Sequence, residues 1–144
     1  MSFASFPGKP RGPVRALFTG MGAKNFRELI CWQLSRELRK TVNGLIKKQP
    51  LAADFDLCGQ LRRATRSATG NIAEGFPCVS HAEFARYLGI AARSLSETED
   101  RLIEALDERL LTEEEAAPAL NLVKRASVAT KRLIASLRPP PDNE

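Results

Sequence analysis

In the stretch QLRRATRSATGNIAEGF, residues 60–76, apolar side chains return every three or four residues. The apolar stripe begins just before the stretch and consists of Leu57, Leu61, Ala64, Ala68 and Ile72. Steps of three and four place side chains on one face of a helix. Gly70 costs a helix about 1 kcal/mol relative to alanine, but the apolar period continues through it. The sequence therefore predicts one helix from about Phe55 to Gly75, with Gly75 in a left-handed cap.

Three further segments show the same period and predict helices at residues 26–48, 80–110 and 112–137. Their starts carry the N-cap residues Asn25, Ser80 and Thr112, each with a glutamate three residues later. Pro118 interrupts the last segment and should kink that helix or mark its true start. The predicted fold class is all-α, an up-down antiparallel four-helix bundle over residues 25–137.

Two of the helices carry apolar residues on more than one face. The core stripe of the first is predicted to be Phe26, Ile30, Leu34, Leu38, Val42, Leu45 and Ile46. The thinner stripe of the fourth is predicted to be Ala116, Leu120, Val123, Ser127, Thr130 and Ile134. Val128, Leu133 and Leu137 form a second apolar edge of the fourth helix. This surplus indicates that the bundle also buries surface against copies of itself, as a homo-oligomer.

A length of 144 residues indicates a single domain. Residues 1–24 are rich in proline and glycine, with four basic and no acidic side chains, and predict a disordered basic tail. A start codon assigned upstream of Met21 explains this tail about as well as a functional basic arm does. Residues 138–144 predict a second disordered tail. Neither a membrane-spanning run nor a secretory signal is visible, so we expect a cytoplasmic protein without membrane contact.

The chemistry-bearing residues are sparse and scattered. Cys31, Cys58 and Cys78 are odd in number and widely spaced, which predicts reduced thiols rather than disulfides or a zinc site. The single histidine, His81, falls in the first turn of the third helix, and we expect it to be exposed rather than a ligand. Phosphate-loop, nucleophile-elbow and di-iron patterns are missing from the sequence. We therefore predict no catalytic residues, no metal and no cofactor: the chain is not an enzyme.

The net charge of +5 is unevenly distributed. Residues 25–75 carry nine basic and five acidic side chains, whereas residues 80–111 carry four basic and seven acidic ones. Candidate nucleic-acid contacts are therefore sought in the first two helices, and they are Arg62, Arg63, Arg66, Arg36, Arg39 and Lys40.

Two interpretations of Arg62, Arg63 and Arg66 are open. They lie close together on one helix and belong either to a solvated face that pairs with Glu97, Glu99 or Glu104, or to a surface that contacts phosphates. Phosphate contacts would fix no base sequence. Arg36, Arg39 and Lys40 of the first helix extend the same patch if the first two helices are neighbours.

A polar stripe runs beside the apolar one in the second helix and consists of Gln60, Arg63, Ser67, Asn71 and Glu74. It is either exposed to solvent or partly buried, with Asn71 and Glu74 bonding across helices or subunits. Trp32 is predicted to pack in the core or at a subunit contact, with base stacking as a weaker alternative.

Several motifs occur in an order that resembles a known family. They are FRELICWQ at residues 26–33, QLRRA at residues 60–64, NIAEG at residues 71–75, SHAEFARY at residues 80–87 and SLSETE at residues 94–99. Over residues 25–137 the chain resembles the four-helix-bundle proteins of the 23S rRNA intervening-sequence family.

This resemblance implies a left-handed bundle that assembles as a ring-like homopentamer, with Trp32, Asn71, Glu74 and Gly75 in structural or oligomer-forming roles. It further implies kinship with the accessory variability proteins of diversity-generating retroelements. Those proteins bind RNA or DNA through basic surfaces and act beside a reverse transcriptase. The chain departs from the family pattern at Thr69, where proline is usual, and at Arg66 and Thr98, where apolar residues are usual. After Gly75 the family continues with small or polar residues, whereas Phe76 follows here.

Overall fold

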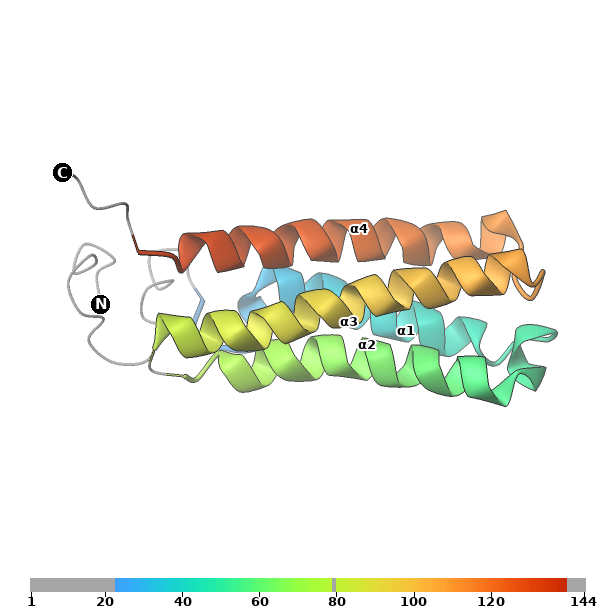
Figure 1. The fold of residues 1–144 in the computed structure, drawn as a ribbon, viewed down its shortest axis with the longest axis horizontal. Coiled ribbons are helices and arrows are strands. Elements are labelled where there is room, and N and C mark those ends of the chain that lie inside the picture. Colours follow the sequence, from blue (N-terminus) through green and yellow to red (C-terminus); the bar gives the residue numbers. More distant parts are fainter. Residues whose placement is uncertain (1–22, 79, 140–144) are drawn as a thin grey trace.

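The computed structural model describes residues 23–78 and 80–139, and its long elements are four helices. They are α1 (Ile30–Leu45), α2 (Phe55–Gly75), α3 (His81–Asp107) and α4 (Glu113–Ser136). The helices lie side by side along one axis, each packed against the next, with α4 also contacting α1 (Figure 1). The predicted up-down four-helix bundle is confirmed. Within the two described ranges no strand occurs.

Buried side chains recur at alternating steps of three and four residues. In α3 they include Phe84, Leu88, Ala91, Leu95, Thr98, Leu102 and Ala105. This seven-residue repeat keeps one face of a helix toward its neighbours when helices cross at about 20°. The core therefore consists of layers along the whole length of the bundle, as in a coiled coil.

The predicted core stripe of α1 is wrong at its N-terminal end. Cys31 and Ser35 are buried there, whereas Ile30 is 66% exposed and Leu34 is half-buried. The prediction advanced by four residues from Ile30, and such a stripe drifts around a helix by about 40° per step. The core follows the seven-residue repeat instead, which places a serine inside and an isoleucine outside.

The core stripe of α4 also keeps a seven-residue repeat, but it differs from the prediction at two of the intermediate positions. Ala119 and Ala126 are fully buried, whereas Leu120 and Ser127 are only half-buried. Val123 belongs to the buried stripe both in the prediction and in the structure. Small residues on the α4 core face let this helix lie close to its neighbours.

The start of the first helix also differs. Asn25 and Glu28 form the predicted capping box, but it caps a separate 3₁₀ turn, Phe26–Glu28. Leu29 is extended, and α1 begins only at Ile30. Most of the two predicted tails, residues 1–22 and 140–144, lies outside the described residues. Ala23, at the edge of the first tail, is buried against the core.

The other helix starts are capped by side chains. Asp54 Oδ1 accepts a hydrogen bond from Leu57 N at 3.0 Å, and Ser80 Oγ accepts one from Glu83 N at 3.1 Å. Thr112 opens α4 with a complete capping box. Pro118 lies inside the continuous α4, so the true start is Glu113, and the missing proline N–H removes a single helical hydrogen bond.

The predicted left-handed cap at Gly75 is wrong. Gly75 is the last residue of α2, and the C-cap residue Phe76 is right-handed, with φ −58° and ψ −43°. The left-handed residue of the described chain is Arg109, with φ 57°, just after α3. The N–H groups of Arg109 and Leu110 bond to the carbonyls of Leu106 and Ala105 at 3.0 and 2.8 Å. This is the Schellman arrangement that usually has glycine at this position.

Among the residues that the model describes, the helices are too short or too polar to cross a lipid bilayer.

Candidate nucleic-acid interface

Arginines of α1 and α2 meet on one side of the bundle because these helices pack against each other. We call this surface the α1–α2 basic face, and it consists of Arg36, Arg39, Arg62 and Arg66. Arg39 is half-buried and the other three are exposed. The two basic sets were expected to form one patch if the first two helices were neighbours, and these helices are neighbours.

Lys40 and Arg63, the other two predicted contacts, lie at the edges of this face. Arg63 precedes Ser67 by one turn, and Ser67 faces α3, where Ser94 Oγ donates to Ser67 Oγ at 2.7 Å. Lys40 Nζ lies 3.7 Å from Glu37 Oε1 on the opposite flank of α1. Both cations are exposed and extend the positive surface sideways.

A hydrogen bond joins the two helices within the face. Arg39 Nη1 donates to Thr69 Oγ1 at 2.8 Å. The Thr69 hydroxyl lies 3.3 Å from the carbonyl oxygen of Arg66, to which it donates. The guanidinium of Arg39 is therefore held beside the backbone at Arg66. Thr69 occupies the position where the resemblance leads one to expect proline, and its hydroxyl supplies this link.

Trp32 packs at the other end of the face. Its ring meets Phe26 edge-on at 5.2 Å, and the Arg36 guanidinium lies over it at 5.9 Å. Trp32 is half-buried against the part of the core that contains Phe84 and Leu88. Trp32 thus packs at the edge of the core, and a contact with another subunit stays a prediction because a single chain does not test it.

Of the two open interpretations of Arg62, Arg63 and Arg66, the one that pairs them with carboxylates of α3 finds no ion pair in the described chain. Throughout residues 23–78 and 80–139, none of these arginines has a carboxylate within 4 Å; Glu104 instead pairs with Arg101 at 2.9 Å. The Arg63 guanidinium folds back over Gly59, where a Cβ would lie 3.2 Å from Nη1. Their charge is therefore left available to an external anion.

The polar stripe of α2 is partly buried, as one of its two interpretations predicted. Asn71 Nδ2 donates to the Ser67 carbonyl at 2.8 Å and lies 3.1 Å from Ser67 Oγ, which in turn meets Ser94. Asn71 therefore acts across helices through Ser67. Glu74 is exposed and lies outside this network. Gly75 is buried where α2 and α3 approach each other closely.

A family model described as 23S rRNA-intervening sequence protein matches residues 27–132, well over half of the chain. The chain belongs to this family. A comparison with curated proteins found no match. The matched range contains α1, α2, α3 and most of α4, so the family's sequence pattern coincides with the bundle and includes the α1–α2 basic face.

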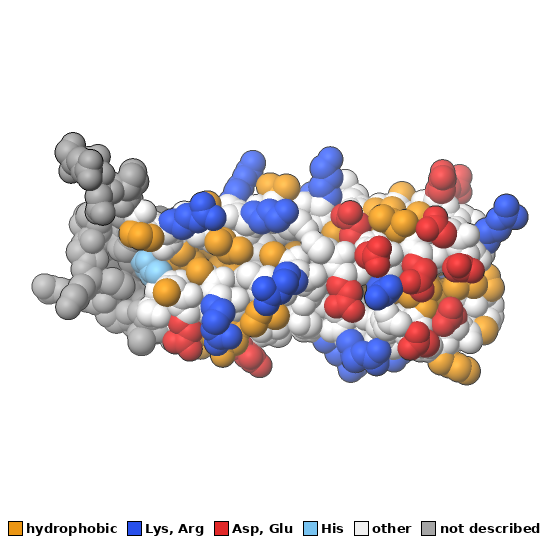
Figure 2. Space-filling view, in the orientation of Figure 1, with side chains coloured by type: hydrophobic (Ala, Val, Ile, Leu, Met, Phe, Trp, Pro, Cys, Tyr) orange, Lys and Arg blue, Asp and Glu red, His pale blue; other side chains and the backbone are white. Residues whose placement is uncertain are grey.

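The family member described here carries a second cationic set that the sequence pattern did not single out. It consists of Arg86 and Arg93 on α3 and Lys124, Arg125, Lys131 and Arg132 on α4. The opposite half of the same helices, residues 97–115, contains nine acidic and two basic side chains and is called the acidic end. Figure 2 shows both gatherings of charge on one face. The sequence could have revealed this cationic set, because the sign of the charge reverses along each of the two helices.

Phe55 was also missed as a surface feature. It is 85% exposed at the first position of α2. Its separation from the apolar stripe, which starts at Leu57, could have shown that it points away from the core.

In the described part of the chain, no three potential metal ligands cluster. His81 is half-buried rather than exposed, and burial lowers its pKa. Burial raises the pKa of Cys31 to about 12. All three cysteines are free.

Proposed function

We propose that this chain is a non-enzymatic protein that assembles with copies of itself and binds the RNA or DNA backbone through the α1–α2 basic face. The observation that carries the proposal is the exposure of Arg62 and Arg66 without a carboxylate partner in the described chain. Guanidinium groups match the geometry of phosphate oxygens, and they contact phosphates without reading bases. Binding is therefore expected to be independent of sequence.

The test is fluorescence anisotropy with labelled RNA and DNA over a range of salt concentrations. Wild type should bind at low salt, and the triple variant Arg62→Glu, Arg63→Glu, Arg66→Glu should lose most of that affinity. Removing one phosphate contact lowers the slope of log K against log salt by about 0.7 to 0.9. The triple variant Lys124→Glu, Lys131→Glu, Arg132→Glu is the matched control, because it reverses the same number of cations on α4. An equal loss in the control, or no wild-type binding at low salt, contradicts the assignment of the face.

The self-assembly half of the proposal rests on apolar side chains left at the surface of α1 and α4. Ile30 is 66% and Val128 43% exposed, and Leu133 is half-buried. Covering such side chains against a second copy would remove apolar area from water. We propose a homopentamer, following the resemblance. Light scattering should give one assembly, and Ile30→Asp should reduce its mass; a monomeric wild type contradicts this half.

The family's description names the intervening sequence of 23S rRNA, so we propose RNA as the first ligand to test. A role beside a reverse transcriptase, as in retroelement accessory proteins, is the second setting for the same surface. A reverse-transcriptase gene with a template repeat next to this gene would favour the second setting, and an insertion in a ribosomal RNA gene would favour the first.

A protein-interaction scaffold without nucleic acid is the alternative function. Ile103, 42% exposed beside the acidic end, favours it, because an apolar side chain within a charged rim is typical of protein contacts. Purification with a bound protein and without nucleic acid would support the alternative.

A further inference from the structure

We propose that the end of the α1–α2 basic face near Phe55 binds single-stranded nucleic acid, with an unpaired base stacked on the Phe55 ring. This inference rests on the proposed function and names the class of nucleic acid.

Among the described residues, Phe55 is the one aromatic residue that is largely exposed to solvent. Its ring is 85% exposed, and Phe26, Trp32 and Tyr87 are all half-buried. Trp32 is already in contact with Phe26, whose ring centroid lies 5.2 Å away, and with the Arg36 guanidinium, which lies over the Trp32 ring at 5.9 Å. The open aromatic surface of the α1–α2 side is therefore Phe55.

Phe55 shares a stripe of α2 with the phosphate-binding candidates. Phe55, Gly59, Arg62 and Arg66 follow one another at steps of four, three and four residues. These steps place them on one flank of the helix, with the Phe55 backbone about 10 Å from that of Arg62. A base on the ring would thus leave its backbone within reach of the arginines.

Gly59 has no side chain to protrude from α2 between Phe55 and Arg62. A Cβ at Gly59 would lie 3.2 Å from Arg63 Nη1, so the guanidinium rests where a side chain would otherwise stand. A guanidinium therefore covers α2 at Gly59, between Phe55 and Arg62. Single-strand binding surfaces combine these two features, an aromatic platform and cations along the backbone.

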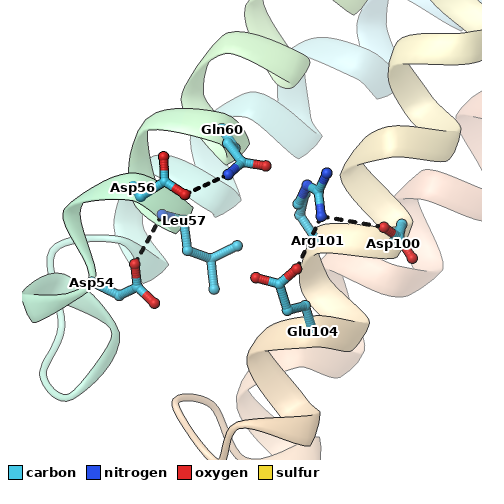
Figure 3. Close-up of polar contacts among 7 residues, drawn as sticks. All are labelled: Asp54, Asp56, Leu57, Gln60, Asp100, Arg101 and Glu104. Carbon is cyan, nitrogen blue, oxygen red and sulfur yellow. Dashed lines mark hydrogen bonds and ion pairs between the residues drawn. The ribbon is translucent and has the colours of Figure 1, made fainter.

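The carboxylates next to Phe55 are engaged by their own helix. Asp54 accepts a hydrogen bond from Leu57 N at 3.0 Å, and Asp56 accepts one from Gln60 Nε2 at 2.7 Å. Figure 3 shows both bonds on α2, with Gln60 on the side that faces Arg101 of α3. These hydrogen bonds partly offset the negative charge of the two acidic groups and so reduce their repulsion of a phosphate.

The experiment compares a labelled 12-nucleotide oligo(dT) or oligo(U) with a 12-base-pair duplex in anisotropy titrations at low salt. Phe55→Ala should weaken single-strand binding by roughly 5- to 150-fold, the range for losing one stacked base. Duplex binding and the salt slope should stay unchanged, because no charge is removed. Phe55→Trp should restore affinity, and its added emission should be quenched by the oligonucleotide.

Ile103→Ala is the matched control, since it removes an exposed apolar side chain beside the acidic end. An equal loss for single strand and duplex, or no loss in Phe55→Ala, overturns the inference. A change of oligomeric state in Phe55→Ala, measured by light scattering, also overturns it and assigns Phe55 to a subunit contact.

The proposed function is judged separately from these outcomes. If wild type binds nucleic acid and the Arg62, Arg63 and Arg66 reversals abolish binding while Phe55→Ala does not weaken it, the basic face stands and the stacking site falls. If wild type binds neither probe, both fall.

Discussion

Gly75 of α2 and Tyr87 of α3 lie so close that a Cβ at Gly75 would sit 2.6 Å from the Tyr87 Cβ. The same Cβ would sit 2.9 Å from Phe84 Cδ1. Glycine is therefore required here by the distance between two helices and not by its backbone conformation. The α2 and α3 helices therefore approach each other closely where the NIAEG motif ends.

Gly75→Ala should destabilise the protein by about 1 to 3 kcal/mol, because an inserted methyl forces the two helices apart. Alanine's better helix propensity offsets about 1 kcal/mol of that cost. Gly70→Ala is the control in the same helix, where an added Cβ meets nothing within 4 Å. It should be neutral or stabilising by up to about 1 kcal/mol. Urea denaturation at fixed protein concentration measures both, and a stable Gly75→Ala would refute the close approach of the two helices.

Arg109→Gly should stabilise the protein by about 1 kcal/mol. Arg109 adopts φ 57°, a left-handed conformation that costs a residue with a Cβ about 1–2 kcal/mol. Glycine removes that cost and is the usual residue after a helix end of this type. Glu108→Gly, at φ −83°, is the neighbouring control and should not stabilise. Thermal unfolding of the two variants against wild type gives the comparison.

Thr69→Val should weaken nucleic-acid binding by a few-fold while leaving the fold intact. Valine keeps the shape of Thr69 but cannot accept the hydrogen bond from Arg39 Nη1, so the guanidinium loses its fixed position. Thr65→Val removes a buried hydroxyl one turn earlier that bonds only to helix carbonyls, and it controls for the loss of such a hydroxyl. Equal affinities for the two variants would show that the Arg39–Thr69 bond does not matter for binding.

Acid should weaken the start of α4 through Glu115. The hydrogen bond from the Thr112 backbone N–H holds the pKa of Glu115 below the ordinary value of 4.5. A lowered folded-state pKa means that the stabilising contribution is present above 4.5 and is lost as pH falls through the folded pKa. Glu115→Gln keeps an acceptor without a titrating group and should show less loss of stability on acidification. Glu114→Gln controls for charge in the same turn. Carboxyl NMR titration checks the direction of the shift.

One thiol per chain should react readily in the folded protein. Cys78 is half-buried, whereas Cys31 and Cys58 are buried. Burial raises the pKa of Cys31 to about 12, so its thiolate, the reactive form, is scarce at neutral pH. Thiol labelling read by mass spectrometry should modify Cys78 first and the others only in denaturant. Rapid labelling of Cys78→Ser would contradict the buried positions of the other two.

The fold could be predicted from the sequence because the apolar period survives across each long segment. Phe55 and Gly75 bound α2 as predicted, and Thr112 caps α4. The registers of α1 and α4 could not be read in the same way. Their cores contain Ser35, Ala119 and Ala126, which carry little apolar signal, so larger residues such as Ile30 dominated the pattern.

The candidate site was only partly predictable. The sequence identified Arg39 and Arg66 as candidates but not the Thr69 hydroxyl that links them, because that contact depends on the distance between two helices. The sequence allowed Arg62 to pair with Glu97, Glu99 or Glu104 of the third helix, and only the packed bundle shows that no carboxylate comes within 4 Å of it in the described chain. Glycine at position 75 suggested a turn because a sequence does not reveal how closely two helices approach.

The reversal of charge along α3 and α4 gives each subunit a large electric dipole moment. The acidic end holds nine acidic and two basic side chains, while the other half of the same helices is cationic. The resulting field acts on a polyanion well before contact, over about one Debye length of 8–10 Å in physiological salt. The field would thus turn an approaching nucleic acid toward the cationic half of α3 and α4 and away from the acidic end.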